Sequence, residues 1–200
     1  MNMIEALVAQ LLATTPLEAA AVALGLIYVV LIVRRNRLGW IAGGLSSAIY
    51  VYLAARARLP MQSALQLYYV LMAIYGWRTW TRMQAADSGR IERWPLYKHA
   101  LMLVAIALVS AVSAQLLARE THAAWPRLDS LTTWTSLFAT WLVARMMLEN
   151  WLYWIGADAV MAYLFAAQGY PFTAGLFLTY MMIALAGFYS WSRKYRLQRR

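Results

Sequence analysis

The sequence is a succession of apolar runs, each close to 20 residues long and bounded by charged residues, Pro or Gly. The hydrocarbon core of a bilayer is about 30 Å thick and a helix rises about 1.5 Å per residue, so such runs predict membrane-spanning helices. Thr15 and Pro16 fit the N-cap and first turn of the first helix. Seven helices are expected, at residues 16–33, 38–55, 61–80, 97–117, 128–148, 150–167 and 172–191.

Composition supports a membrane environment. Hydrophobic residues make up 63% of the chain and charged residues 13%, whereas soluble domains have roughly 45–50% and about 25%. The net charge of +10 does not indicate nucleic acid, since the 18 Lys and Arg lie in short clusters between apolar runs. There is no Cys, zinc spacing, Walker loop or dinucleotide fingerprint. We therefore expect an all-α integral membrane protein without a cofactor, a metal or a nucleic-acid partner.

The basic residues predict the orientation of the chain. Assigning the loops alternately to the two sides of a membrane places 14 of the 18 Lys and Arg on one side. By the positive-inside rule this side is cytoplasmic, so the C-terminus is expected inside and the N-terminus outside a bacterial inner membrane. Residues 84–94 then form a cytoplasmic linker. Residues 1–15 lack the features of a removable signal peptide, and residues 4–12 fit a short interfacial helix.

The chain contains an internal repeat with an offset of 111 residues. The stretch LYYVLMAIYGWRTWTR, which begins at Leu67, aligns without gaps with LTYMMIALAGFYSWSR, which begins at Leu178. Two three-helix units keep the same orientation only if one further helix separates them, so we expect two parallel bundles and a central helix, a 3+1+3 arrangement. The expected parts are an N-terminal segment 1–15, a first bundle 16–82, a linker with the central helix 83–127, a second bundle 128–192 and a basic tail 193–200. Further pairs in this register are Trp40 with Trp151, Pro60 with Pro171, Gly76 with Gly187 and Trp80 with Trp191.

A polar and aromatic face on the helix at 150–167 is the main candidate site. Asn150, Trp154 and Asp158 are spaced four apart, which puts an amide, an indole and a carboxylate on one side of the helix, with Trp151 beside them. Ionisable residues within a bilayer are costly and usually face a cavity or a partner. The combination suits a cationic heteroaromatic solute. The alternative is that Asp158 pairs with a Tyr hydroxyl, or stays neutral, and only holds helices together.

Two other helices add candidates. On the third predicted helix, Gln66, Tyr69 and Trp77 lie near one stripe, although its small residues equally suit close packing of helices. On the fifth, Ser136 lies nearer the middle of the bilayer than the other hydroxyl residues. Neither His has metal-ligand spacing or a nucleophile partner, so the sequence shows no recognisable set of catalytic residues.

These strings resemble the PnuC family of vitamin transporters. The similarity rests on IYGWRTW with the preceding Gln66, on ENWLYW followed by Asp158 and on LFAAQGYPFTA, and it covers nearly the whole chain after about Thr15. The resemblance implies a 3+1+3 fold related to the SWEET sugar transporters. As function it implies facilitated diffusion of nicotinamide riboside, which a cytoplasmic kinase then traps inside by phosphorylation.

The resemblance also implies which residues bind the solute, between the two bundles. Members that take nicotinamide riboside often have Asn where this chain has Ser46 and Asp158. Thiamine and riboflavin, the vitamins of related branches, are therefore alternative substrates. Related carriers often assemble as dimers or trimers. The implied contacts are Gln66, Tyr69, Trp77, Asn150, Trp154 and Asp158, and we add Ser46, Ser136 and Trp151 as further candidates.

Two other classes of protein remain open at this point. A membrane-embedded enzyme acting on a lipid or a quinone would need a cluster of His, Asp or Glu, whereas Asp158 is essentially the only acid expected in mid-membrane. A structural or sensory subunit without a solute pathway would still need hydrogen-bond partners for the polar stripes within the membrane, which counts against this class. A uniporter that uses alternating access, without an ATP motor, is the favoured function.

Asp158 supplies a test of proton coupling. If its carboxyl group binds and releases a proton in each transport cycle, a pH gradient imposed across liposomes should drive the solute to accumulate against its own gradient. The measurement is uptake of labelled solute by the reconstituted protein. Uptake that stops at equal concentrations on both sides would exclude the coupling.

Overall fold

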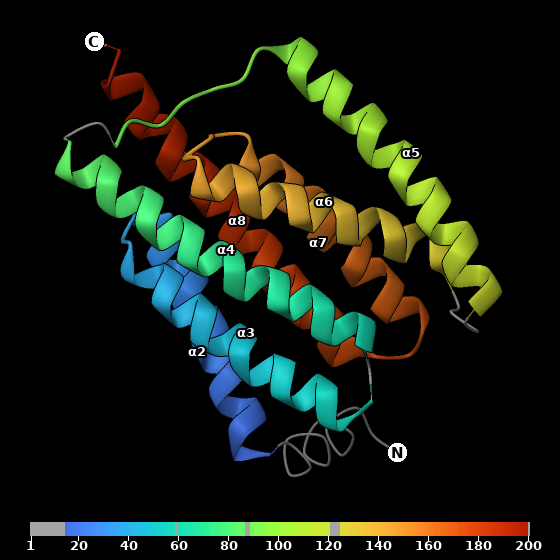
Figure 1. The fold of residues 1–200 in the computed structure, drawn as a ribbon. Coiled ribbons are helices and arrows are strands. Elements are labelled where there is room, and N and C mark those ends of the chain that lie inside the picture. Colours follow the sequence, from blue (N-terminus) through green and yellow to red (C-terminus); the bar gives the residue numbers. More distant parts are fainter. Residues whose placement is uncertain (1–14, 59, 87–88, 121–124, 200) are drawn as a thin grey trace. The chain divides into compact units, whose positions relative to one another are not determined.

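Helices make up most of the chain (Figure 1). The computed structural model describes residues 15–58, 60–86, 89–120 and 125–199, and the interfacial helix expected at 4–12 lies outside them. Within the described residues there are seven helices, the number expected from the sequence. They are α2 (Pro16–Val33), α3 (Leu38–Arg56), α4 (Pro60–Ala85), α5 (Leu96–Glu120), α6 (Pro126–Ala144), α7 (Asn150–Ala167) and α8 (Pro171–Leu197).

The helix starts follow the sequence signals closely, whereas three C-terminal ends differ: α4 and α8 run on to Ala85 and Leu197, beyond the expected ends at 80 and 191, and α6 ends early. The hydroxyl of Thr15 accepts a hydrogen bond from the Glu18 amide at 3.2 Å, and Pro16 is the first helical residue, as expected for the start of α2. The helix expected at 128–148 is four residues shorter at its C-terminal end and stops at Ala144. Met146 adopts φ +53°, a left-handed conformation that ends the helix and turns the chain.

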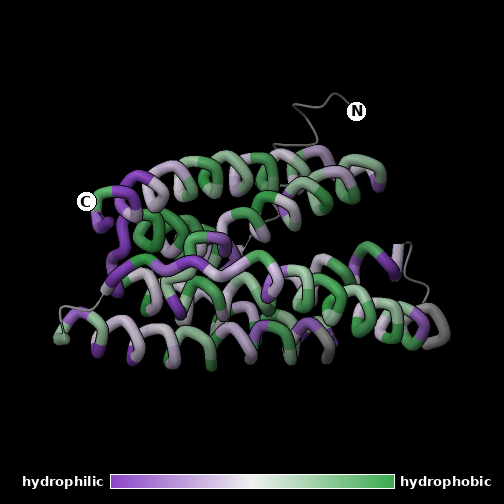
Figure 2. The backbone as a smooth tube through the Cα atoms, turned by 90° about the horizontal axis from the view of Figure 1, so that it is seen from above, coloured by the Kyte–Doolittle hydropathy of each residue, from purple (hydrophilic) through white to green (hydrophobic). Residues whose placement is uncertain are grey.

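Four helices of the described chain, α2, α3, α5 and α8, are by length and composition apolar enough to cross a membrane. The other three, α4, α6 and α7, have comparable lengths of 26, 19 and 18 residues but lack an equally apolar stretch. Figure 2 shows mainly hydrophobic or neutral residues along the helices and hydrophilic ones toward the C-terminus. The protein is therefore all-helical, with helices suited to a bilayer.

The chain divides into two compact units, Met1–Ser88 and Gly89–Arg200. The described part of the first unit contains α2, α3 and α4, and α3 packs against both of the others. The second unit contains α5 to α8, in which α7 packs against α6 and α8. In both units, therefore, the middle helix of three consecutive ones contacts its two neighbours.

Two serines attach α5 to α6 within the second unit. Ser110 Oγ donates to the carbonyl oxygen of Ser130 at 3.4 Å, and the indole nitrogen of Trp134 donates to Ser113 Oγ at 2.9 Å. Hydrogen bonds between helices are worth about 0.6–2 kcal/mol each in a membrane. They explain why α5 belongs to the packing of the second unit.

In the first unit a Trp ring fills the space over a helical Gly. Trp40 of α3 lies against Gly76 of α4, where an added Cβ would overlap the indole. The same indole meets Trp80 edge-on, with 5.7 Å between ring centroids, and contacts Tyr28 of α2 at 5.8 Å. Trp40 therefore joins all three helices of this unit.

The second unit contains the same arrangement 111 residues later. Trp151 of α7 lies against Gly187 of α8 and meets Trp191 edge-on, with 5.4 Å between ring centroids. Both indoles are at most 2% exposed, as are their counterparts in the first unit. The internal repeat of the sequence is thus also a repeat of side-chain packing.

The turns recur at the same offset. Arg35 with φ +56° follows α2, and Met146 with φ +53° follows α6. Arg58 with φ +57° precedes α4, and Gly169 with φ +80° precedes α8. These are the residues of the described chain with left-handed φ, and in each pair the second lies 111 positions after the first.

The packing predicts that Gly187→Ala destabilises the protein. An Ala Cβ at this position would lie 2.7 Å from ring carbons of Trp151, so the indole would have to move, and overpacking of this kind costs about 1–3 kcal/mol. Thermal unfolding in detergent should show a lower midpoint. Gly175→Ala in the same helix is the control, since no atom lies within 4 Å of its added Cβ. Equal midpoints for the two variants would contradict this packing.

Candidate functional site

The polar face predicted on α7, formed by Asn150, Trp154 and Asp158 and called here the α7 face, lies within the second unit. Asn150 is completely buried, Asp158 is 5% exposed and Trp154 is partly exposed. No ion pair or hydrogen bond joins Asp158 to another residue in the part of the chain that the structure describes. The pairing with a Tyr hydroxyl that the sequence left open is therefore not observed there.

Asn150 has one satisfied and one unsatisfied polar atom. Its side-chain nitrogen donates to the carbonyl oxygen of Met147 at 2.6 Å. Its side-chain oxygen is buried and has no hydrogen-bond partner among the described residues. A buried acceptor without a partner costs about 1–3 kcal/mol. Within the described residues this oxygen is thus an acceptor that the protein itself leaves without a donor.

Trp151 borders the α7 face but is occupied by packing. Its indole is 2% exposed and is held between Gly187 and Trp191. Its ring nitrogen is buried and finds no acceptor in the described chain. Of the two neighbouring tryptophans, Trp154 is the one with surface left for contact.

The two hydroxyl candidates have partners or backbone roles. Ser46 of α3 is 6% exposed and donates to the carbonyl oxygen of Ala21 at 2.8 Å, which ties α3 to α2. Ser136 of α6 is partly exposed, and its carbonyl oxygen accepts a hydrogen bond from the Thr140 hydroxyl at 2.8 Å. Packing accounts for Ser46, while Ser136 is partly exposed.

Three candidates lie on α4 in the first unit. Gln66 and Tyr69 are partly exposed and lie about one turn apart. Trp77 is also partly exposed, and the guanidinium carbon of Arg37 lies 5.2 Å from its ring centroid. The guanidinium of Arg37 thus makes a cation–π contact with this indole.

Comparison of the two copies shows that the α7 face is specific to the second. The residues 111 positions earlier, in α3, are Gly39, Gly43 and Ser47. An added Cβ at Gly43 would lie 2.7 Å from the ring of Tyr28, so this side of α3 closes directly on α2. In α7 an amide and an indole replace the two glycines. The amide, indole and carboxylate of the α7 face are therefore present in only one of the two copies.

A buried carboxylate at the start of α7 was missed by the sequence analysis. Glu149 is 5% exposed, and its oxygen Oε1 accepts a hydrogen bond from Arg93 Nε at 2.8 Å. This hydrogen bond raises the pKa of the Arg93 guanidinium above its ordinary value. Only the position of Glu149 next to Asn150 in the string ENWLYW hinted at it, because Arg93 lies 56 residues away in the sequence.

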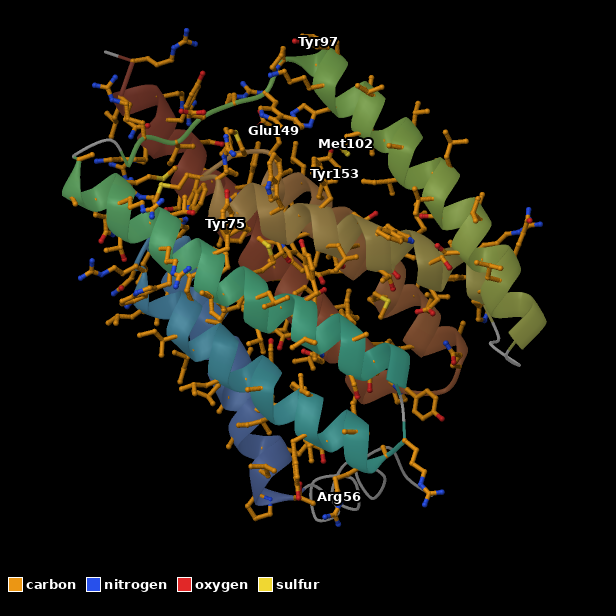
Figure 3. All side chains as sticks on the ribbon, viewed as in Figure 1. Arg56, Tyr75, Tyr97, Met102, Glu149 and Tyr153 are labelled. Carbon is orange, nitrogen blue, oxygen red and sulfur yellow. The ribbon has the colours of Figure 1, made fainter. Side chains whose placement is uncertain are left out.

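Glu149 lies close to Tyr153, one turn further along α7 (Figure 3). The ring of His99 is hydrogen-bonded through Nδ1 to the Tyr153 hydroxyl at 3.0 Å, and its Nε2 lies 3.9 Å from Glu149. Trp94 contacts His99 and Trp141, with centroids 5.7 and 5.6 Å away. Among the described residues no group of His, Cys, Asp or Glu is placed to hold a metal ion. Through these contacts His99 of α5, Trp141 of α6 and Tyr153 of α7 form one cluster, which joins the three helices.

Apolar helices around a buried polar and aromatic face are the architecture of a polytopic membrane transporter. Residues 15–193 match the sequence model of the family described as nicotinamide mononucleotide transporter. Since the match covers most of the chain, the protein belongs to this family. The class favoured from the sequence, a transporter and not an enzyme, is confirmed.

Individual relatives confirm the resemblance to PnuC. The riboflavin/roseoflavin transporter RibM of Streptomyces davaonensis is 29% identical over 174 residues, 84% of this chain and 80% of RibM. The nicotinamide riboside transporter PnuC of Escherichia coli is 23% identical over 201 residues, 88% of this chain and 84% of PnuC. A crystal structure of the vitamin B3 transporter PnuC superposes with a TM-score of 0.72 at 21% identity, over 96% of this chain and 87% of the other. The fold is therefore shared with that structure.

The neighbouring tryptophans should respond differently to the same substitution. Trp151→Phe removes part of a fully packed indole over Gly187 and should lower the midpoint of thermal unfolding. Trp154→Phe is the matched control, three residues further along α7. It changes a partly exposed ring and should therefore shift the midpoint less. A larger shift for Trp154→Phe would mean that the packing roles are assigned the wrong way round.

Proposed function

We propose that the protein is a uniporter for a small cationic aromatic vitamin, with nicotinamide riboside as the favoured solute. The observation that carries the proposal is the α7 face, found in a member of this transporter family. Asp158 offers counter-charge, Trp154 offers stacking and cation–π attraction, and Asn150 offers an acceptor without a partner. Together these groups match the ring charge and the polar substituents of such a solute.

The buried carboxylate favours a cationic ring over a neutral one. Nicotinamide riboside and thiamine each contain a positively charged aromatic ring, whereas the flavin ring of riboflavin is neutral. An ionised Asp158 without a basic partner among the described residues gains most from a solute that brings the opposite charge. Riboflavin is the second candidate, because RibM is 29% identical to this chain. Thiamine is the third.

For the architecture we propose that all seven helices cross the membrane in a 3+1+3 arrangement. Helices α2–α4 and α6–α8 would be two parallel bundles, with α5 as the central helix. The recurrence of the Trp and Gly packing and of the left-handed turns supports this arrangement. The corresponding parts of the chain are 1–15, 16–82, 83–127, 128–192 and 193–200.

Transport would proceed by alternating access, with the two bundles rocking against each other and the solute moving down its gradient. Gln66, Tyr69 and Trp77 of α4 are proposed as further residues that bind the solute. Trp77 would exchange the guanidinium of Arg37 for the solute cation. Ser46, Ser136 and Trp151 are weaker candidates, since packing accounts for Ser46 and Trp151.

The cellular setting follows from the family and the charge distribution. The protein is a multi-pass protein of the bacterial inner membrane, and the positive-inside rule supports an N-terminus outside and a C-terminus in the cytoplasm. Phosphorylation of the imported vitamin by a cytoplasmic kinase would keep the inward gradient. Assembly as a dimer or trimer is part of the proposal.

Calorimetric binding to the detergent-purified protein tests the function. Nicotinamide riboside, its phosphorylated mononucleotide, thiamine and riboflavin are titrated in turn. We expect selective binding of nicotinamide riboside, a loss of binding of about tenfold or more in Trp154→Ala, and a comparable loss in Asp158→Asn. Leu152→Ala is the control, because Leu152 lies on the exposed side of the same helix.

The other outcomes are equally informative. Selective binding of riboflavin, unchanged in Asp158→Asn, would replace the cationic solute by the flavin. Binding that survives Trp154→Ala would remove the α7 face from the site. If none of the four compounds binds, the substrate lies outside the proposed vitamins.

A further inference from the structure

Residues 89–95, called here the strap, are bonded along their backbone to the turn between α6 and α7. The amide of Glu92 donates to the carbonyl oxygen of Met146 at 3.1 Å, and the amide of Leu148 donates to the carbonyl oxygen of Glu92 at 2.9 Å. Glu92 and Met147 thereby form an isolated parallel β-bridge. The strap thus holds the residues on both sides of Met147.

Side chains fasten the strap at two further points. Arg93 donates to the buried Glu149 carboxylate at 2.8 Å, and the Trp94 amide donates to its other oxygen at 3.4 Å. The Ile91 amide donates to Gln198 Oε1, beyond α8, at 3.2 Å. Residues close in the sequence are therefore bonded to the start of α7 and to the end of α8.

The first copy of the repeat shows that the turn itself does not need a strap. Arg35 turns the chain there with the same left-handed φ as Met146, and Asn36 Oδ1 accepts a hydrogen bond from the Leu38 amide at 2.9 Å. Leu38, the counterpart of Glu149, is 51% exposed. Since burying a carboxylate is costly, Glu149 serves something other than the formation of the turn.

The turn leads directly to the α7 face. Met147, whose neighbours on both sides are bonded to Glu92, supplies the carbonyl oxygen that accepts from the Asn150 side-chain nitrogen at 2.6 Å. This hydrogen bond fixes which way the amide lies. It therefore also fixes where its unpartnered oxygen points.

We propose that the strap is a positioning element for the solute site. The Arg93–Glu149 ion pair and the Glu92 bridge hold the turn at 145–149, and the Met147 carbonyl then orients the amide of Asn150. Arg93 and Glu149 are positioning residues, because they act through Asn150 and not on the solute. The inference rests on the proposed function, since it requires the α7 face to bind the solute.

The test compares Arg93→Ala with Arg93→Lys in the full-length protein reconstituted in liposomes. Arg93→Ala should raise KM for nicotinamide riboside about tenfold and leave the maximal rate within about twofold, because a mispositioned amide weakens binding without altering later steps. Arg93→Lys keeps a cation beside Glu149 and should return KM to within about threefold of the wild type. Hydrogen exchange of the segment 146–148 should be faster in Arg93→Ala.

Ser113→Ala is the matched control for a loss of stability alone, because it removes a hydrogen bond between α5 and α6 that does not touch the strap. It should lower the unfolding midpoint and leave KM unchanged. A wild-type KM in Arg93→Ala, or an equal rise of KM in Ser113→Ala, would overturn the positioning role. If the wild type transports no tested vitamin, the proposed function fails, and unchanged exchange at 146–148 in Arg93→Ala would then refute the strap separately.

Discussion

Each unit depends on the contact between an indole and a helical glycine. Lipid tails are as apolar as Leu side chains, so no hydrophobic effect drives helices together within a bilayer. The helices associate instead through close packing and hydrogen bonds. Gly76 and Gly187 let Trp40 and Trp151 lie directly on the neighbouring helix, and an added Cβ at either position would enter the ring. The edge-on contacts with Trp80 and Trp191 then fix the orientation of each indole. The turns and the polar face are built around these two centres.

The two copies keep this packing and differ in chemistry. The first closes the side of α3 that carries Gly43 against Tyr28, whereas the second places an indole at the equivalent position in α7. Only the second copy has a buried acid at the start of its middle helix. A repeated framework supplies stability in both places, so one copy is free to carry an amide, an indole and a carboxylate in an apolar environment.

The helices and the repeat could be predicted because each depends on a pattern that is visible in the sequence itself. Apolar runs of bilayer length gave the spans, and the ungapped pairing of Trp40 with Trp151 anticipated the shared packing. The predicted ends of α4 and α8 were too early, because both helices continue through the polar residues that were taken to end them. The predicted end of α6 was too late, because a left-handed Met has no sequence signal comparable to that of Gly. The partner of Glu149 was out of reach, since an ion pair between residues 56 positions apart depends on the tertiary fold. For Asn150 and Asp158, the sequence indicated the shared face but not that one polar atom of Asn150 is already bonded to Met147.

The strap also orders the events of biosynthesis. Residues 89–95 leave the ribosome before α5, yet their partners in the turn at 145–149 and at Gln198 are made afterwards, the last of them 107 residues later. The Trp40 centre, by contrast, uses only residues of α2, α3 and α4 and is complete when α4 has emerged. Contacts of long sequence separation form late in folding. The nascent chain can therefore form the Trp40 centre early, whereas the contacts that orient Asn150 must wait for the turn at 145–149, and the bond from Ile91 to Gln198 must wait until α8 has been synthesised.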